Sequence, residues 1–190
     1  FIAPKGTRFL GARTILNNDF NGDGKSDMVF IQGGPDFPPY VPRHNEILLS
    51  QPDGSYNVSY LPGTKSQFHG GASGDIDGDG DVDIIVTPGP KNEVILYQNN
   101  SDGTFKVKTL LRNVGRNYNA SLWDVDGDKN LDLLIDGHEE PLSIFWGEGD
   151  GNFSKKQEVL GFENQVMSDI EFSDLNNDGL LELVVASSLK

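Results

Sequence analysis

The sequence predicts an all-β protein, namely a β-propeller built of four-stranded antiparallel blades, with about three and a half blades present in the chain. Three observations predict this fold. An acidic nine-residue segment recurs four times, at intervals of 56, 49 and 50 residues. An apolar triplet follows each segment directly, and an Asp-Gly turn recurs later in three of the repeats. No segment has a helical spacing of apolar residues long enough to compete with this pattern.

The acidic segments begin the repeating pattern. They are Asp19–Asp27, Asp75–Asp83, Asp124–Asp132 and Asp174–Glu182. These segments hold 15 of the 29 acidic residues, so the net charge of −14 is concentrated at four places. Diffuse acidity would indicate only a solvated surface. This concentration instead indicates a partner of opposite charge.

The apolar triplets after the acidic segments predict buried strands, because they are short, rich in β-branched residues and bounded by turn residues. The triplets are Met28–Phe30, Ile84–Val86, Leu133–Ile135 and Leu183–Val185. A second apolar run follows in three repeats, at 47–49, 94–97 and 144–146. Together with the strand that enters the acidic loop, these runs account for three strands of each unit.

A turn with a fixed pattern follows the second apolar run. It occupies residues 53–56, 102–105 and 150–153, and reads Asp-Gly-x-Tyr or Asp-Gly-x-Phe. Asp-Gly between apolar runs is a strong hairpin signal, since glycine takes the positive φ that the turn requires. A fourth strand leaves each turn, and residues 105–110 alternate polar and apolar side chains.

Four strands in about fifty residues is the size of a propeller blade, whereas the repeats of a stacked β solenoid are usually much shorter. We predict a single repeat region over residues 1–190, with repeats at about 8–62, 63–112, 113–161 and, in part, 162–190. Closed propellers need about 4 to 8 blades. We therefore expect that the region belongs to a longer chain, or that another copy completes the ring.

The acidic loops are predicted to bind calcium, up to four ions at one per loop. Side-chain oxygens at positions 1, 3, 5 and 9 converge on one point, with a backbone carbonyl at position 7. An all-oxygen shell with three or four charges suits Ca²⁺, whereas Zn²⁺ prefers His or Cys and Mg²⁺ prefers a smaller octahedron with more water. The predicted ligand residues are Asp19, Asn21, Asp23, Lys25, Asp27, Asp75, Asp77, Asp79, Asp81, Asp83, Asp124, Asp126, Asp128, Asn130, Asp132, Asp174, Asn176, Asp178, Leu180 and Glu182.

Two other interpretations of the loops are weaker. An EF-hand requires Glu at position 12, whereas position 12 is apolar in all four loops: Phe30, Val86, Ile135 and Val185. A simple Asx-rich turn could explain one loop. Four loops in register, each with oxygen side chains at all four positions, make that interpretation improbable.

The four loops are not equivalent. The second and third carry Asp at positions 1, 3, 5 and 9, and we predict that the second binds tightest. The first has Asn21 at position 3, and the fourth has Asn176 there and Glu182 at position 9. The third has Lys129 where the others have glycine, which predicts backbone strain and places a cation near the ion.

The loops and their period resemble the FG-GAP repeat family, also called VCBS-type repeats, found in integrin α-subunit propellers and many bacterial secreted proteins. The matching motif is Asp-x-Asp/Asn-x-Asp-Gly-x-x-Asp with an apolar strand after it, then the Asp-Gly-x-Phe/Tyr turn. The resemblance implies a propeller with calcium in the hairpin loops at one rim, between the first and second strands of each blade. Lys129 and Glu182 depart from the motif. Family members include adhesion receptors, lectins and accessory domains of secreted enzymes.

Several classes of function are disfavoured. The net charge of −14 argues against a nucleic-acid partner, and no apolar stretch predicts insertion into a membrane. His44, His69 and His138 are scattered, without a catalytic pattern, so we predict that the chain is not an enzyme. The alternative is a carboxylate pair for glycoside hydrolysis, but nearly all the clustered acidic residues are assigned to metal binding.

The leading hypothesis is a secreted or cell-surface calcium-binding module that acts in adhesion or recognition, with a glycan or protein ligand. One alternative is an accessory domain of a secreted polysaccharide-degrading enzyme. Another is a structural component of a surface layer or filament, in which copies of the chain associate with one another.

A proline-rich insertion in the first repeat is the candidate ligand loop. It covers residues 33–44 and carries Phe37, Tyr40, Arg43 and His44. A stiffened loop with aromatic and basic side chains is typical of recognition sites. An ordinary decorated loop is an equally good interpretation of the sequence.

Overall fold

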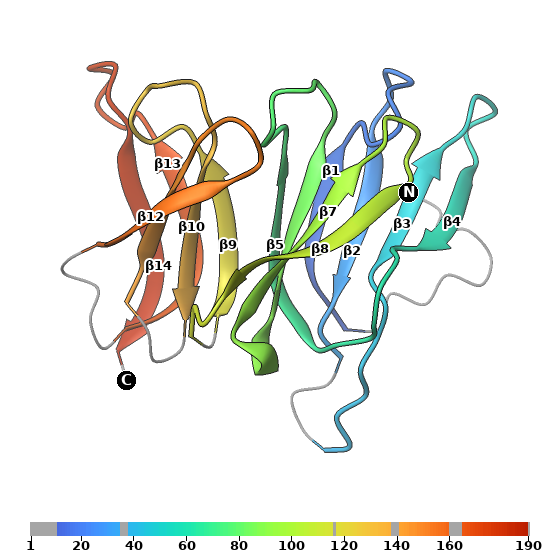
Figure 1. The fold of residues 1–190 in the computed structure, drawn as a ribbon, viewed down its shortest axis with the longest axis horizontal. Helices are drawn as coiled ribbons and strands as arrows, with labels where there is room; N and C mark the ends of the chain where they lie inside the picture. The colour runs from blue at the N-terminus through green and yellow to red at the C-terminus, as the bar shows by residue number, and fades with distance from the viewer. Residues whose placement is uncertain (1–10, 35–37, 116, 138–140, 160–164, 190) are drawn as a thin grey trace.

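The chain forms consecutive antiparallel β-sheets (Figure 1). In the described part there are fourteen strands and one short 3-10 helix, Gly89–Lys91. This confirms the predicted all-β class. None of the described helical residues forms a segment that could span a bilayer. The computed structural model describes residues 11–34, 38–115, 117–137, 141–159 and 165–189.

Three sheets have four strands each, and in each of them the strands follow one another in chain order. The first sheet contains β1 (Ala12–Asn18), β2 (Asp27–Gln32), β3 (Glu46–Ser50) and β4 (Tyr56–Tyr60). The second contains β5 (Phe68–Gly74), β6 (Asp83–Pro88), β7 (Glu93–Asn99) and β8 (Phe105–Arg112). The third contains β9 (Asn117–Trp123), β10 (Asp132–Gly137), β11 (Ser143–Gly147) and β12 (Phe153–Glu158).

The last sheet has two strands in the described residues, β13 (Gln165–Ser173) and β14 (Glu182–Leu189). They pair antiparallel, as the first two strands do in the other sheets. The predicted four-stranded antiparallel unit is therefore present three times, and its first half a fourth time.

The second strand of a sheet can be buried on both faces, which explains its continuous apolar run. Ile84, Ile85 and Val86 of β6 are all fully buried. Successive side chains of a strand point to opposite faces. Ile84 accordingly packs in a cluster with Ile31 of the first sheet, whereas Ile85 packs in a cluster with Leu133 of the third.

The same alternation joins the third sheet to the fourth. Leu133 of β10 faces the second sheet, and its neighbour Leu134 packs with Ile170 of β13. Trp123 and Trp146 also pack against this last cluster, and the ring of Trp123 lies 5.6 Å from that of Phe172. Each pair of neighbouring sheets thus shares its own apolar core.

The first strands of the four sheets lie next to one another: β1 contacts β5, β5 contacts β9, and β9 contacts β13. Together they line one cavity of about 620 Å³. Gly70 permits the approach of β9, because a Cβ atom there would lie 2.4 Å from the carbonyl oxygen of Tyr118. The Thr87 hydroxyl donates a hydrogen bond of 3.2 Å to the same carbonyl.

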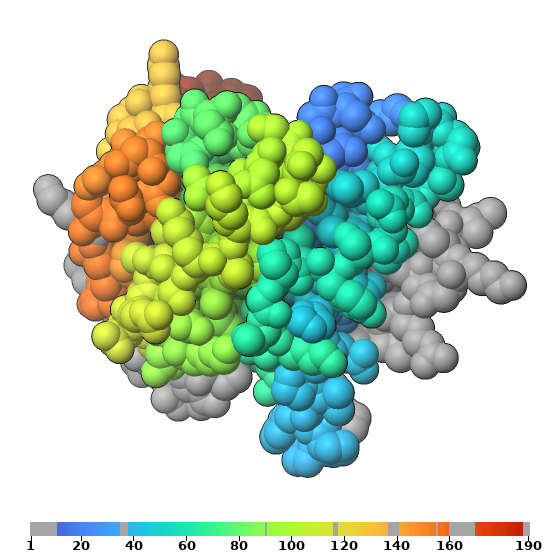
Figure 2. Space-filling model, turned by 45° about the vertical axis from the view of Figure 1, so that its right-hand side comes forward, coloured from blue at the N-terminus to red at the C-terminus, as the bar shows by residue number. Residues whose placement is uncertain are grey.

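The insertion between β2 and β3 projects away from the sheets and stands out at the bottom of the space-filling view (Figure 2). Its base is attached to the connection between β4 and β5 by a two-way backbone bridge. The Arg43 N–H donates to the Ser66 carbonyl at 2.9 Å, and the Ser66 N–H donates to the Arg43 carbonyl at 3.1 Å. Phe37 of the candidate ligand loop lies outside the described residues.

Candidate metal centres

The four acidic loops join the first and second strands of each sheet, and all four lie along the upper edge in Figure 1. Every loop folds with positive φ at positions 4 and 6. Glycine occupies six of these eight positions. The exceptions are Asn177, at 59°, and Lys129, at 75°. Since left-handed backbone costs an ordinary L-residue roughly 1–2 kcal/mol, Lys129 carries the strain that its position predicts.

The carboxylate at position 1 organises the backbone of its loop. In the second loop Asp75 accepts hydrogen bonds from the N–H groups of Gly78, at 2.8 Å, and Gly80, at 3.0 Å. In the third loop Asp124 accepts from Gly127 and Lys129 at the same two distances. In the first and fourth loops, Asp19 and Asp174 also accept two backbone bonds each, but from the N–H groups at positions 5 and 6 rather than 4 and 6.

The carboxylate at position 9 attaches the loop to the sheet. Asp27 is fully buried and accepts from the N–H of Phe20 at 2.9 Å and from the N–H of Ser50, at the end of β3, at 2.7 Å. Asp83 and Asp132 are equally buried and accept from the corresponding third strands, β7 and β11. A buried carboxylate at this position therefore links the loop and the second strand to the third strand.

The fourth loop accommodates its longer side chain at position 9. One carboxylate oxygen of Glu182 accepts the Leu175 N–H at 2.8 Å, as the Asp residues at position 9 accept the N–H of position 2 in the first and third loops. The other oxygen accepts the side-chain amide of Asn176 at 3.1 Å. Glu182 thus preserves the loop fold, but one of its oxygens is bonded to another predicted ligand.

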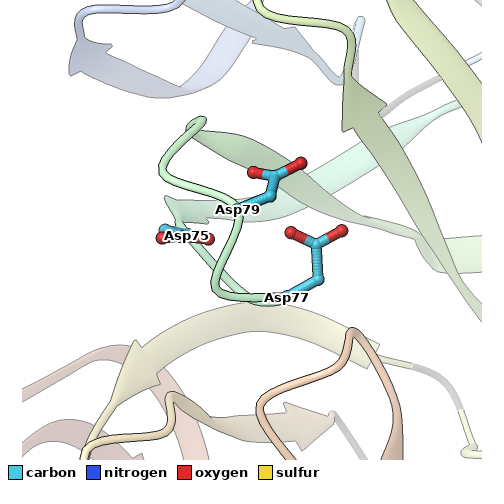
Figure 3. A group of neighbouring side chains, drawn as sticks. All are labelled: Asp75, Asp77 and Asp79. Carbon is cyan, nitrogen blue, oxygen red and sulfur yellow. The ribbon is translucent and has the colours of Figure 1, made fainter.

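The structure brings the acidic side chains together in the second and third loops. Oxygens of Asp75, Asp77 and Asp79 lie within 4.8 Å of one another, and the three side chains are grouped around the turn of the loop (Figure 3). Asp124, Asp126 and Asp128 form an equivalent group. In the first and fourth loops an asparagine stands at position 3, so an oxygen from an amide replaces one of the charges.

Like charges in these groups disfavour ionisation. The pKa of Asp83 is raised from 3.8 to about 6, first by burial and further by the charges of Asp77 and Asp79. Burial also raises the pKa of Asp132, and the charges of Asp126 and Asp128 add to that shift. A bound cation would favour the ionised form of all these groups.

One carboxylate oxygen of the second loop gives a direct test of fit to a cation. Asp77 Oδ2 accepts a 2.6 Å hydrogen bond from Gln98 Nε2, but Asp77 Oδ1 is buried and has no hydrogen-bond partner among the described residues. A buried, unpaired anionic oxygen is costly. Coordination of a cation would satisfy it, and a set of carboxylate and carbonyl oxygens is the donor set that Ca²⁺ prefers.

The residues at position 7 have a visible role through their N–H groups. In each loop this N–H donates to the carboxylate at position 5, at 2.8 to 2.9 Å; the residues are Lys25, Asp81, Asn130 and Leu180. That their carbonyl oxygens coordinate the ion stays a prediction.

A contact between repeats was missed by the sequence reasoning. Phe20, at position 2 of the first loop, is fully buried, and its ring lies 6.3 Å from that of Phe105 in the Asp-Gly turn of the next repeat. Ile76, at position 2 of the second loop, is buried in a cluster that Phe153 of the third repeat joins. The signal was available, because position 2 is apolar in all four loops.

Hydrogen bonds to the backbone carbonyls at position 2 strengthen these contacts. The Asn99 side-chain amide donates to the Phe20 carbonyl at 2.9 Å, and the Gly151 N–H donates to the Ile76 carbonyl at 3.0 Å. The Asp-Gly turn regions of the second and third repeats therefore cover the acidic loop of the preceding repeat. Leu175, at position 2 of the fourth loop, is 65% exposed and has no such cover in the described part of the chain.

The candidate ligand loop is only partly brought together. Arg43 and His44 line a groove of about 440 Å³, with Glu46, Tyr60 and Lys65. Tyr40 is 57% exposed and is not part of this lining. Tyr60 and Lys65 also line the groove, but no sequence pattern indicates them, since they follow the insertion by about twenty residues.

Consecutive antiparallel sheets with an oxygen-rich loop at the same corner of each define a class of β-repeat protein whose acidic loops could hold a cation. The family model for the FG-GAP-like repeat matches residues 19–86, 75–135 and 124–185. The chain therefore belongs to the FG-GAP-like repeat family. Each match begins at position 1 of one loop and ends at position 12 of the next.

Among solved structures, the chain is similar to the biofilm matrix protein Bap1 of V. cholerae. The two share 20% sequence identity over 93% of this chain, with a TM-score of 0.53. The chain spans 28% of the length of that protein. At this identity the likeness concerns the fold. A search of curated proteins gave no match.

Proposed function

We propose that the chain is a calcium-stabilised, non-catalytic module of an extracellular or cell-surface protein, and that it acts in adhesion or recognition. The observation that carries this proposal is the recurrence of one oxygen-rich loop, in register, at the same corner of every sheet. Membership of the FG-GAP-like repeat family supports it. Calcium is abundant outside cells, where modules with dissociation constants of about 10⁻⁴ to 10⁻³ M are loaded.

Calcium in this proposal has a structural role. The ion would be held by the side chains at positions 1, 3, 5 and 9 of each loop and would neutralise carboxylates that otherwise repel one another. Because Asp27, Asp83 and Asp132 also receive hydrogen bonds from the third strand of their sheet, an ion at the loop stabilises the sheet as well as the turn.

We further propose that the sheets are blades of a propeller. The shared cores between neighbouring sheets and the single cavity lined by the four first strands support this arrangement. A closed ring has about 4 to 8 blades. Further repeats of a longer chain, or a second copy, would supply the remaining blades.

The adhesive role rests on two lines of support. The first is the FG-GAP-like repeat itself, which we predict to act in this chain as a scaffold without catalytic groups. The second is the likeness in fold to a protein of a biofilm matrix. The ligand would be a glycan or a protein on a surface.

Thermal unfolding with a metal count tests the proposal. The melting temperature is measured with calcium, with magnesium and with excess chelator. At calcium 100-fold above the dissociation constant, each site adds about 2.7 kcal/mol to stability. We expect a calcium-selective rise in melting temperature and three or four bound ions per chain. Indifference to chelator, with no bound ion, would reduce the loops to turns and remove the main support for an extracellular role.

Binding to immobilised cell-surface polysaccharides and proteins, with calcium and with chelator, tests the recognition part. We expect calcium-dependent retention on at least one surface. Retention on none of them would contradict the adhesive role while leaving the calcium role intact.

A further inference from the structure

The groove at the base of the insertion differs in charge from the rest of the molecule. The chain has 15 basic and 29 acidic residues. The groove instead carries two basic side chains, Arg43 and Lys65, and one acidic side chain, Glu46. Burial raises the pKa of Glu46, although the Arg43 charge partly opposes the shift. The groove is therefore a local basic site on an acidic protein.

The basic groups of the groove have hydrogen-bonding capacity that is not filled within the described residues. Among the described residues, neither the Arg43 guanidinium nor the Lys65 ammonium donates a hydrogen bond or joins an ion pair, and Arg43 Nε is buried without a partner. An arginine offers five donors in a planar fork that fits a carboxylate. Leaving such a donor buried and unpaired is costly. A bound anion would satisfy it.

The groove also presents an aromatic surface. Tyr60, on the edge strand β4, is 66% exposed, and its ring lies 5.5 Å from that of His44. Tyr60 stands directly opposite Glu46 in the pairing of β3 with β4. An exposed ring next to hydrogen-bonding groups combines an apolar platform with polar contacts that orient a ligand. The flat C–H face of a pyranose ring fits such a platform.

The walls of the groove are fixed by backbone rather than by side chains. The Arg43–Ser66 bridge holds the insertion against the β4–β5 connection through main-chain groups alone. The side chains that face the groove are thus free for a ligand, and they can be replaced without removing the bonds that shape it.

We propose that this groove binds an acidic saccharide, with a sugar ring packed on Tyr60 and its carboxylate held by Arg43 and Lys65. This inference rests on the proposed recognition function and names the chemical class of the ligand. An acidic peptide would satisfy the basic groups equally, but it would leave the exposed ring of Tyr60 without a specific role.

Calorimetric titration with trigalacturonic acid, in the presence of calcium, tests the proposal. We expect saturable binding that weakens as salt is added, because screening reduces the attraction between charges. The methyl ester of the same trisaccharide keeps the sugar rings and removes the charge, so we expect it to bind at least roughly tenfold more weakly. Equal binding of the acid and the ester would overturn the role of the basic groups.

Matched variants locate the site. The double variant Arg43→Gln, Lys65→Gln and the single variant Tyr60→Ala are each expected to lower the affinity by roughly tenfold or more. The controls are Lys106→Gln, which removes an exposed charge outside the groove, and Val58→Ala, which shortens an exposed apolar side chain of β4 that does not line it. Both controls are expected to retain wild-type affinity. The calcium-dependent melting temperature of every variant reports whether it folds.

The outcomes separate this inference from the function on which it rests. If folded groove variants bind the trisaccharide as wild type does, the groove is not the site, while recognition stands. If trigalacturonic acid does not bind but the chain adheres to another surface, the ligand class is wrong and recognition again stands. Tighter binding of triglutamate than of the saccharide would identify an acidic peptide as the partner and overturn the proposal. Failure to bind any surface contradicts both.

Discussion

The charge count of the second loop can be tested with a pair of opposite substitutions at position 3. Asp77→Asn removes one carboxylate from the second loop and keeps an oxygen that can accept the hydrogen bond from Gln98. Asn21→Asp adds one carboxylate to the first loop at the equivalent position. The two variants differ from wild type by one charge each, in opposite directions.

The expected size follows from Coulomb's law. Two unit charges 4 Å apart interact by about 1 kcal/mol in water, so one carboxylate and a divalent ion interact by about 2 kcal/mol. This corresponds to roughly 30-fold in the dissociation constant. In saturating calcium it also corresponds to a change of about 4–8 °C in melting temperature for a chain of this size.

Calcium titration calorimetry and thermal unfolding measure both quantities. We expect Asp77→Asn to weaken one site roughly 30-fold and Asn21→Asp to strengthen one site by a similar factor. In chelator, Asp77→Asn should not destabilise the fold, because it removes a charge that raises the pKa of Asp83. Unchanged calcium affinity in Asp77→Asn, or an equal loss of stability with and without calcium, would refute the reasoning.

Three further outcomes are expected. Without metal, the raised pKa of Asp83 means that the stability this group contributes is fully present below pH 3.8 and is lost as the pH rises through about 6. Denaturant unfolding in chelator should therefore show up to about 3 kcal/mol less stability at pH 7 than at pH 4 from this group. Saturating calcium should reverse this dependence of stability on pH. Lys129→Gly should raise stability by about 0.5–1 kcal/mol in thermal unfolding, since it relieves a φ of 75°; a loss of stability would show that no strain is stored there. Phe20→Ala should lower the free energy of unfolding by about 3–5 kcal/mol, because the Phe20 side chain is fully buried. Leu175→Ala, at a 65% exposed position, should change it by less than about 0.5 kcal/mol. Similar losses for the two variants would contradict the cover seen over the first loop.

The strands and the loops could be predicted from the sequence because their signals are local. The apolar triplet 84–86 lies in a strand that is buried on both faces, and a continuous apolar run is the expected pattern for such a strand. The strain at Lys129 was predictable for the same reason, since the positive φ belongs to a fixed position of the loop.

The groove and the contacts between repeats could not be read in this way, because they depend on residues distant in sequence. Tyr60 and Lys65 reach the insertion only through the pairing of β3 with β4 and the bridge from Arg43 to Ser66. The apolar residue at position 2 is a local signal, but its partner lies 85 residues later in the case of Phe20 and Phe105. Position in a repeat does not show which neighbouring repeat will cover a side chain.

The Asp-Gly turns have a consequence for how the repeats behave as an array. The second turn region contacts its own loop through Asn99 and Asp83, and it contacts the preceding loop through Asn99 and Phe20. In a linear array, stability is a sum of the intrinsic stability of each repeat and a coupling energy between nearest neighbours. Here the shared turn supplies part of that coupling at the edge that carries the acidic loops. If calcium binds the loops as proposed, we expect an ion in one loop to stabilise the adjacent loop, so that the array fills with calcium over a narrower concentration range than independent sites would.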